Sequence, residues 1–149
     1  MTIIQTLAAE HVVFHHVFDH IEQAVPGLKT VAEVRALGAL LEALLHVHSK
    51  IEDQLLIEPL EPNIIQLGQH ENFHAEHEQI DADLASLTRI RRVTEARTVL
   101  LRAVLAARKH FDKEERIIFP LARRLLTAKT LTSLGKRWRE QRHAITTEP

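Results

Sequence analysis

The sequence predicts an all-α protein, an up-down-up-down four-helix bundle with a short C-terminal fifth helix at about Thr130–Arg142. Helix-forming Ala, Leu, Glu and Arg are abundant, whereas 149 residues include only 4 Gly and 5 Pro. Aromatic residues make up 4% and Tyr is absent, which disfavours a sheet. Apolar residues recur at helical spacing in four long segments that are joined by short turns. No linker divides the chain, so we expect residues 1–149 to form a single domain.

The first two helices have clear boundary signals. The first is expected at Ile3–Ala24 and is stopped by the Pro-Gly pair at 26–27. Thr30 and Glu33 have the spacing of a capping box, which opens the second helix. The apolar stripe of that helix continues to near Pro59. These signals predict two long antiparallel helices in the first half of the chain.

The third and fourth helices are bounded by polar residues. We expect a turn at Pro59–Asn63, with Asn63 as the N-cap of the third helix. The apolar pattern fades at residues 89–92, and Thr94 can cap the fourth helix. Pro120 is expected to kink that helix or to mark a restart.

Composition excludes several classes of function. The formal net charge is −1 and the pI is about 6.8, so neither nucleic acid nor a membrane surface is expected as a partner. The absence of Cys excludes disulfides, zinc-thiolate sites and iron–sulfur sites within the chain, and it fits a cytoplasmic protein. The first ten residues do not resemble a signal peptide, and no apolar run approaches the roughly 20 residues of a membrane helix.

A pattern of histidine and glutamate occurs twice. Residues 48–57 and 110–119 both read His-x-x-x-Glu-acid-x-aliphatic-aliphatic-apolar, and a Pro follows each copy. A Glu-His pair precedes each copy, at 10–11 and at 76–77. Since residues four apart share a helix face, each copy places an imidazole beside a carboxylate. Four such faces turned inward would form a metal cage.

The surroundings of these pairs favour a metal over ordinary hydrogen bonding. His48 and Glu52 lie among leucines on their helix, and His110 and Glu114 lie on the apolar stripe of theirs. A carboxylate in a bundle core is costly unless it is paired or bound to a metal. A lone core histidine usually satisfies one hydrogen bond, but two His/Glu pairs and two further histidines need more partners than such bonds supply. Because Lys and Arg are scarce on these stripes, a cation is the expected counter-charge.

The ligand types narrow the choice of metal. A mixed nitrogen and oxygen set without thiolates favours iron or manganese, with zinc as an alternative. Two carboxylates shared by about five imidazoles predict two metal ions with each Glu bridging. Such a set leaves at least one open coordination position, which suits a small ligand such as dioxygen.

The doubled motif resembles the hemerythrin-like, His-His-Glu cation-binding family, which builds a non-haem di-iron site inside a four-helix bundle. The resemblance runs from Ile3 to about Arg142, and residues 131–142 are similar to the fifth-helix tail of many members. It implies bridging roles for Glu52 and Glu114. It further implies imidazole ligands from each of the four helices in turn: His11, His48, His77 and His110.

The third helix leaves the ligand choice open. Oxygen-carrying hemerythrins use two histidines four residues apart there, a spacing that His70 and His74 have. Glu76-His77 instead matches the Glu-His signature of the broader family and mirrors Glu10-His11. We take His77 as the first candidate, His74 as a fifth imidazole ligand, and His70 as the third candidate.

Several neighbouring residues have two interpretations. His15 lies one turn beyond His11, and its counterpart in the repeat is Asp81, so this pair could hydrogen-bond the ligands or merely line the core. Asp53 and Glu115 directly follow the two glutamates and point about 100° away on the helix. We interpret them as surface acids.

Two classes of function fit this site. The first is a non-haem di-iron binding protein that binds or senses a diatomic ligand, dioxygen or nitric oxide, or that handles iron. The alternative is a di-iron enzyme that acts on peroxide or nitric oxide. The ferritin-like carboxylate class is disfavoured because it uses Glu-x-x-His rather than His-x-x-x-Glu. The sequence does not separate binder from enzyme, and it predicts neither a protein partner nor an oligomeric state.

Overall fold

The computed structural model describes residues 1–68 and 73–147, with side chains described up to residue 144. Every regular element within these residues is helical, which confirms the prediction of an all-α protein. The elements in chain order are α1 (Ile3–Ala24), η1 (Val25–Gly27), α2 (Val31–Glu52), η2 (Asp53–Ile57), α3 (Glu58–Gln66), α4 (Phe73–Ser86), α5 (Val93–Lys113), η3 (Glu114–Ile118), α6 (Phe119–Leu125) and α7 (Ala128–Thr147).

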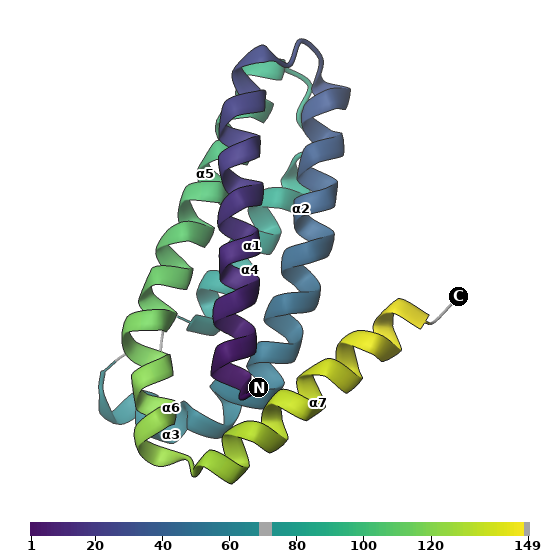
Figure 1. The fold of residues 1–149 in the computed structure, drawn as a ribbon. Coiled ribbons are helices and arrows are strands. Elements are labelled where there is room, and N and C mark those ends of the chain that lie inside the picture. The colour runs from purple at the N-terminus through teal and green to yellow at the C-terminus, as the bar shows by residue number, and fades with distance from the viewer. Residues whose placement is uncertain (69–72, 148–149) are drawn as a thin grey trace.

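Four long helices, α1, α2, α4 and α5, lie side by side along the long axis of the molecule (Figure 1). Their facing side chains form two apolar clusters. One cluster contains Phe18, Leu41, Leu84 and Val104, and the other lies toward α3, α6 and α7. His11, His48 and His77 fall between the two clusters along their helices, and His110 lies beside Phe111 at the end of the first cluster. The polar site therefore has apolar packing on both sides.

The first helix and the start of the second match the expected boundaries, but α2 ends at Glu52 rather than near Pro59. The first helix spans Ile3–Ala24 as predicted, and Pro26 and Gly27 fall in the short 3₁₀ turn that follows it. The Thr30 hydroxyl accepts a hydrogen bond from the Glu33 backbone N–H at 3.2 Å. The Glu33 carboxylate accepts one from the Thr30 N–H at 2.8 Å. The predicted capping box is therefore confirmed.

The predicted turn at Pro59–Asn63 is wrong, because these residues belong to α3. Pro59 lies in the first turn of this helix, where no intrahelical partner is needed for its missing N–H. Asn63 is consequently inside α3 rather than an N-cap, and α4 begins at Phe73.

The C-terminal helix is longer than predicted. It runs over 20 residues from Ala128 to Thr147 instead of about Thr130–Arg142. Figure 1 shows α7 crossing the lower end of the bundle beside the start of α1 and then extending away from it. At Gly135 an added Cβ would lie 2.5 Å from the Met1 carbonyl oxygen and 2.8 Å from the Thr2 carbonyl carbon. The backbones of α7 and the N-terminus therefore approach so closely that only glycine fits.

Gly135→Ala is expected to destabilise the protein by about 1–3 kcal/mol, because the new methyl group meets backbone atoms that have little room to move. This clash outweighs the gain in helix propensity that alanine ordinarily brings. Chemical denaturation would measure the change. Gly27→Ala is the matched control, since its Cβ would meet nothing within 4 Å. Equal stability of Gly135→Ala and the natural protein would contradict the close approach.

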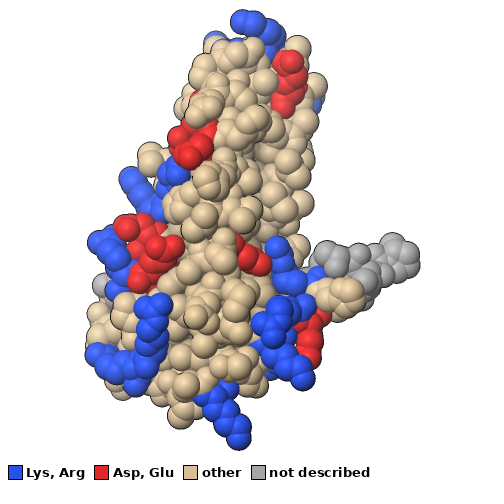
Figure 2. Space-filling model, viewed as in Figure 1, with Lys and Arg blue, Asp and Glu red and all other residues tan. Residues whose placement is uncertain are grey.

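The exterior is mixed in charge. Figure 2 shows a largely uncharged stripe over α1, with Lys, Arg, Asp and Glu side chains interspersed on both sides. A shallow apolar groove of about 360 Å³ runs between α1 and α2 and is lined by side chains that include Val13, Val17, Leu37 and Leu40. None of the helices in residues 1–68 and 73–147 combines the length and the apolar character that a membrane span requires.

Candidate metal centre

Six polar side chains are buried together where α1, α2, α4 and α5 meet. Each is at most 5% exposed, which is unusual for histidine and glutamate in a protein core. They are the histidines of all four helices and the glutamates that follow one turn after two of them: His11, His48, Glu52, His77, His110 and Glu114.

The six side chains form two overlapping groups that share both carboxylates. In each group the ligand atoms lie within 4.8 Å of one another. The first group joins His11 and His48 to Glu52 and Glu114, and the second joins the other two histidines to the same two carboxylates. Each group therefore offers four ligand atoms that could hold a cation, and both groups use the same two carboxylates.

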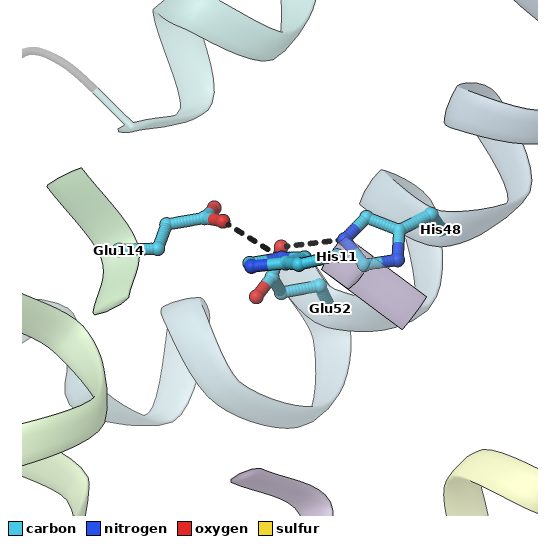
Figure 3. Close-up of side chains that lie close together, drawn as sticks. All are labelled: His11, His48, Glu52 and Glu114. Atoms are coloured by element: carbon cyan, nitrogen blue, oxygen red, sulfur yellow. Dashed lines mark ion pairs between the residues drawn. The ribbon is translucent and has the colours of Figure 1, made fainter. Parts of the chain in front are cut away.

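The first group is drawn in Figure 3. The Nε2 atom of His11 lies 3.4 Å from Oε2 of Glu114. The Nε2 atom of His48 lies 3.6 Å from Oε2 of Glu52, one turn away on the same helix. Both imidazoles therefore turn the same ring nitrogen toward the carboxylates.

The second group is tighter. The Nε2 atom of His110 lies 2.7 Å from Oε1 of Glu114, and the Nε2 atom of His77 lies 3.6 Å from the same oxygen. The Nε2 atoms of the two histidines are only 2.6 Å apart. His77 also reaches Oε2 of Glu52 at 3.9 Å. Four donor atoms from three helices thus converge on one small volume.

The inward-facing atoms fit a cation. Within the described part of the chain, Nε2 of His11 and of His48 and both oxygens of each carboxylate are buried without a hydrogen bond. An uncompensated buried polar atom costs roughly 1–3 kcal/mol. Six such atoms facing one another are hard to explain in a purely structural core, whereas metal ligation would satisfy all of them.

Each histidine is oriented by a carboxylate on its other side. The Nδ1 atom of His48 lies 2.8 Å from Glu10, and that of His110 lies 2.6 Å from Glu76. Because an ionised carboxylate only accepts hydrogen bonds, Nδ1–H must be the donor, and the Nε2 lone pair is left for a metal. The remaining two pairs are His11 with Glu115 at 2.9 Å and His77 with Asp53 at 3.0 Å.

The outer carboxylates correct two sequence-based interpretations. Asp53 and Glu115 are not merely surface acids, since each accepts a hydrogen bond from a site histidine of another helix. Of the two interpretations left open for His15 and Asp81, hydrogen bonding to the site residues is not what the structure has: His15 faces Arg108 at 3.0 Å, and Asp81 faces an exposed histidine. His15 instead packs against Phe18 and Phe111. The sequence does carry a signal for these outer carboxylates. In both copies of the repeat, each of them is directly next to a site residue in the chain.

A π-helical turn begins directly after Glu52 and another begins at Glu114. Glu52 ends α2 directly before η2, and Glu114 is the first residue of η3. Such turns insert an extra residue into a helix and commonly occur at functional sites. Pro59 and Pro120 follow at matching positions, in the first turns of α3 and α6. The expected break at Pro120 is thus a helical restart preceded by a π turn.

Aromatic rings enclose the first group. The ring of His11 stacks on Phe111 with centroids 3.9 Å apart and an angle of 6° between the planes. Trp138 of α7 donates its indole N–H to Glu10 at 3.0 Å, and Glu10 also accepts from His48. The C-terminal helix therefore helps to hold His48 in place through the Glu10 carboxylate.

The metal-free site has unusual protonation states. Burial lowers the pKa of His77, but its hydrogen bonds to Asp53 and Glu114 outweigh this effect and raise the pKa to about 9. Burial also lowers the pKa of His110, but the negative charge of Glu114 outweighs this effect and raises the pKa to about 9. Burial, together with the nearby charge of Glu114, raises the pKa of Glu52 well above its ordinary value. For Glu114 the raising effect of burial is overcome by His110, and its pKa is well below the usual range.

Metal loading is consequently expected to release protons. At pH 7, His77 and His110 carry an extra proton in the metal-free protein, and a metal requires both imidazoles in the neutral form. The apparent metal affinity should therefore rise with pH from 7 toward 9, the folded-state pKa of both histidines. Calorimetric titration in buffers of different ionisation enthalpy measures the released protons. Binding without proton release would contradict ligation by these residues.

The structure does not bring every predicted residue to this site. His11, His48, Glu52, His77, His110 and Glu114 meet as described, but the His74 side chain is 69% exposed and faces Asp53 and Glu78. His70 lies outside the described residues.

The fold and the buried ligand set indicate a helical cation-binding protein. The hemerythrin HHE cation-binding domain matches residues 2–122, a span that holds all six site residues and most of the chain. The chain belongs to this family, as the doubled motif suggested. A search of curated proteins and a search of solved structures each found no match. The matched region ends before α7, so Trp138 lies beyond it.

Proposed function

We propose that this protein binds two non-haem metal ions, iron in the first place, with manganese or zinc as alternatives. The observation that carries this proposal is the pair of overlapping ligand groups that share Glu52 and Glu114. Each metal would take Nε2 of two imidazoles, and the two carboxylates would bridge. The donor set contains nitrogen and oxygen but no thiolate, which favours iron or manganese.

We propose further that the centre binds or senses a small diatomic ligand, dioxygen or nitric oxide, or handles iron. Two imidazoles and two shared carboxylates leave each metal fewer protein ligands than an octahedral ion accepts, so coordination positions stay open. The apolar clusters above and below the site favour a small, weakly polar ligand. Bound iron would supply reversible ligand binding or electron exchange there. The residues of this chain hold the imidazole protons on Nδ1 and exclude bulk water.

Three broader features belong to the same proposal. The helices would run up, down, up and down, so that the two halves of the repeat face each other. Residues 1–149 would act as one metal-binding domain, with α7 tied to the site through Trp138 and Glu10. We also propose that the protein works in the cytoplasm, which its lack of Cys fits.

Elemental analysis of the purified protein, with absorption spectra in air, after reduction and after nitric oxide addition, tests the proposal. About two irons per chain and a spectrum that responds reversibly to these ligands would support a binding protein. Catalytic consumption of peroxide or nitric oxide at the same centre would favour the enzyme alternative. A protein that takes up no iron, manganese or zinc would overturn both.

A further inference from the structure

The six site residues are sealed unequally from solvent. The four first-group residues, which include Glu114, are fully buried, and His110 is 2% exposed. His77 is the most accessible of the six at 5%. A cation that enters from water therefore has to displace fewer covering side chains at His77 than at any of the other five site residues.

One surface pocket opens onto His77. It has a volume of about 180 Å³ and lies between α2 and α4. Three imidazoles line it, from His46, His74 and His77 itself, and so do three carboxylates, from Asp53, Glu78 and Asp81. One lysine is the only Lys or Arg among its lining residues, so the three carboxylates outnumber it. Imidazole and carboxylate groups with an excess of negative charge attract divalent cations.

A second pocket opens onto His110 and has the opposite character. It is larger, about 420 Å³, and its lining contains three Lys or Arg side chains against two acids. Lys113 pairs with Glu76 at 2.9 Å and lies over the Phe73 ring, 4.4 Å from its centroid. This second pocket places the ammonium group of Lys113 close to His110, and its positive charge repels an approaching metal ion.

A continuous set of contacts joins the first pocket to the site. The exposed His74 ring lies 3.3 Å from Glu78 through Nε2 and 3.2 Å from Asp53 through Nδ1. The other carboxylate oxygen of Asp53 lies 3.0 Å from Nδ1 of His77. Asp53 thus touches an imidazole at the surface and an imidazole of the buried centre at once.

We propose that this pocket is the uptake route for the metal, in which His74, Glu78 and Asp53 capture a divalent cation and pass it to His77. The inference rests on the proposed metal-binding function. Within the described residues only the two buried groups form compact sets of three or more ligands, so the pocket is not a third permanent site. Loose spacing suits a transit position, because a cation held too tightly there would not move on.

The test is the rate at which metal-free protein takes up Co²⁺, followed by stopped-flow visible absorption. The double variant His74→Ala/Glu78→Ala should load about tenfold more slowly, because the local concentration of cations at the pocket falls. The final number of bound Co²⁺ ions should equal that of the natural protein. Both residues are exposed, so the fold should tolerate their removal. Raising the ionic strength should slow the natural protein more than the double variant.

The matched control is Lys109→Ala/Asp112→Ala, which removes two charged groups from the pocket at His110. It should load at least as fast as the natural protein. Equal loading rates for the His74/Glu78 variant and the natural protein would overturn the uptake route. A variant that loads fewer Co²⁺ ions at equilibrium would also overturn it, because His74 would then be a permanent ligand. Failure of the natural protein to bind Co²⁺, Fe²⁺, Mn²⁺ or Zn²⁺ would instead refute the proposed function itself.

Discussion

Glu114→Ala is expected to reduce the metal content from about two ions per chain to one or fewer. Glu114 belongs to both ligand groups, and its two oxygens face different histidines, Oε2 toward His11 and Oε1 toward His110. Its loss removes one ligand from each metal. The fall in affinity should exceed the roughly 10–100-fold that loss of an outer hydrogen-bond partner typically costs. Elemental analysis after dialysis against a known free metal concentration measures it.

Asp112→Ala is the control for Glu114→Ala. Asp112 lies on the same helix two residues earlier, but it is exposed and pairs only with Arg116 among the described contacts. This variant should keep its full metal content. If Glu114→Ala also kept two ions per chain, Glu114 would not be the bridge that we propose.

Removal of the metal is expected to lower the midpoint of thermal unfolding by about 10 °C or more. A ligand present at a thousand times its dissociation constant stabilises the native state by about 4 kcal/mol. For a chain of this size, each kcal/mol shifts the midpoint by roughly 2–4 °C. The metal-free protein must also bury the unpaired oxygens of Glu52 and Glu114, which adds to the loss. Calorimetry of the loaded protein with and without a chelator measures the shift.

The Glu114→Ala variant supplies the control for this experiment, since a protein with little bound metal should respond weakly to the chelator. Identical midpoints for loaded and chelated natural protein would argue for a structural bundle without a metal. Such a bundle would lose stability as the pH falls from about 6.5 toward 4, because burial lowers the pKa of His11 to about 4 and protonation of this imidazole then favours the unfolded chain.

The helices were largely predictable because their signals are local. A Pro-Gly pair and a capping box fixed the end of α1 and the start of α2. The region after Glu52 was not predictable in the same way. A proline such as Pro59 is equally compatible with a loop and with the first turn of a helix. Which of the two forms depends on packing against the rest of the bundle. The π turns before the two prolines depend on the same packing, and no residue type marks them.

The candidate site was predictable to the extent that helical spacing determines it. The four-residue spacing placed His48 beside Glu52 and His110 beside Glu114, as the structure has them. Spacing did not choose between His74 and His77, since residues three apart differ by only about 60° around a helix. The rotation of α4 against its neighbours decides that choice and leaves His74 facing solvent.

Asp53 and Glu115 were misinterpreted for a related reason. Each side chain points about 100° away from the glutamate that precedes it. When its helix is considered alone, this direction leads away from the core. In the assembled bundle that direction leads to a histidine of the neighbouring helix. Contacts between helices are not encoded in the periodicity of either one.

The outer hydrogen bonds are related by an approximate twofold pattern. His48 donates to Glu10 as His110 donates to Glu76, and the same correspondence links the bonds to Asp53 and Glu115. Each half of the chain therefore contributes two imidazoles and one of the two shared carboxylates, and neither half contains a complete group. A single helical hairpin could build such a centre only by pairing with a second copy of itself. Duplication and fusion of an ancestral hairpin of that kind would leave the repeat seen in this chain, with α7 as an addition to one half alone.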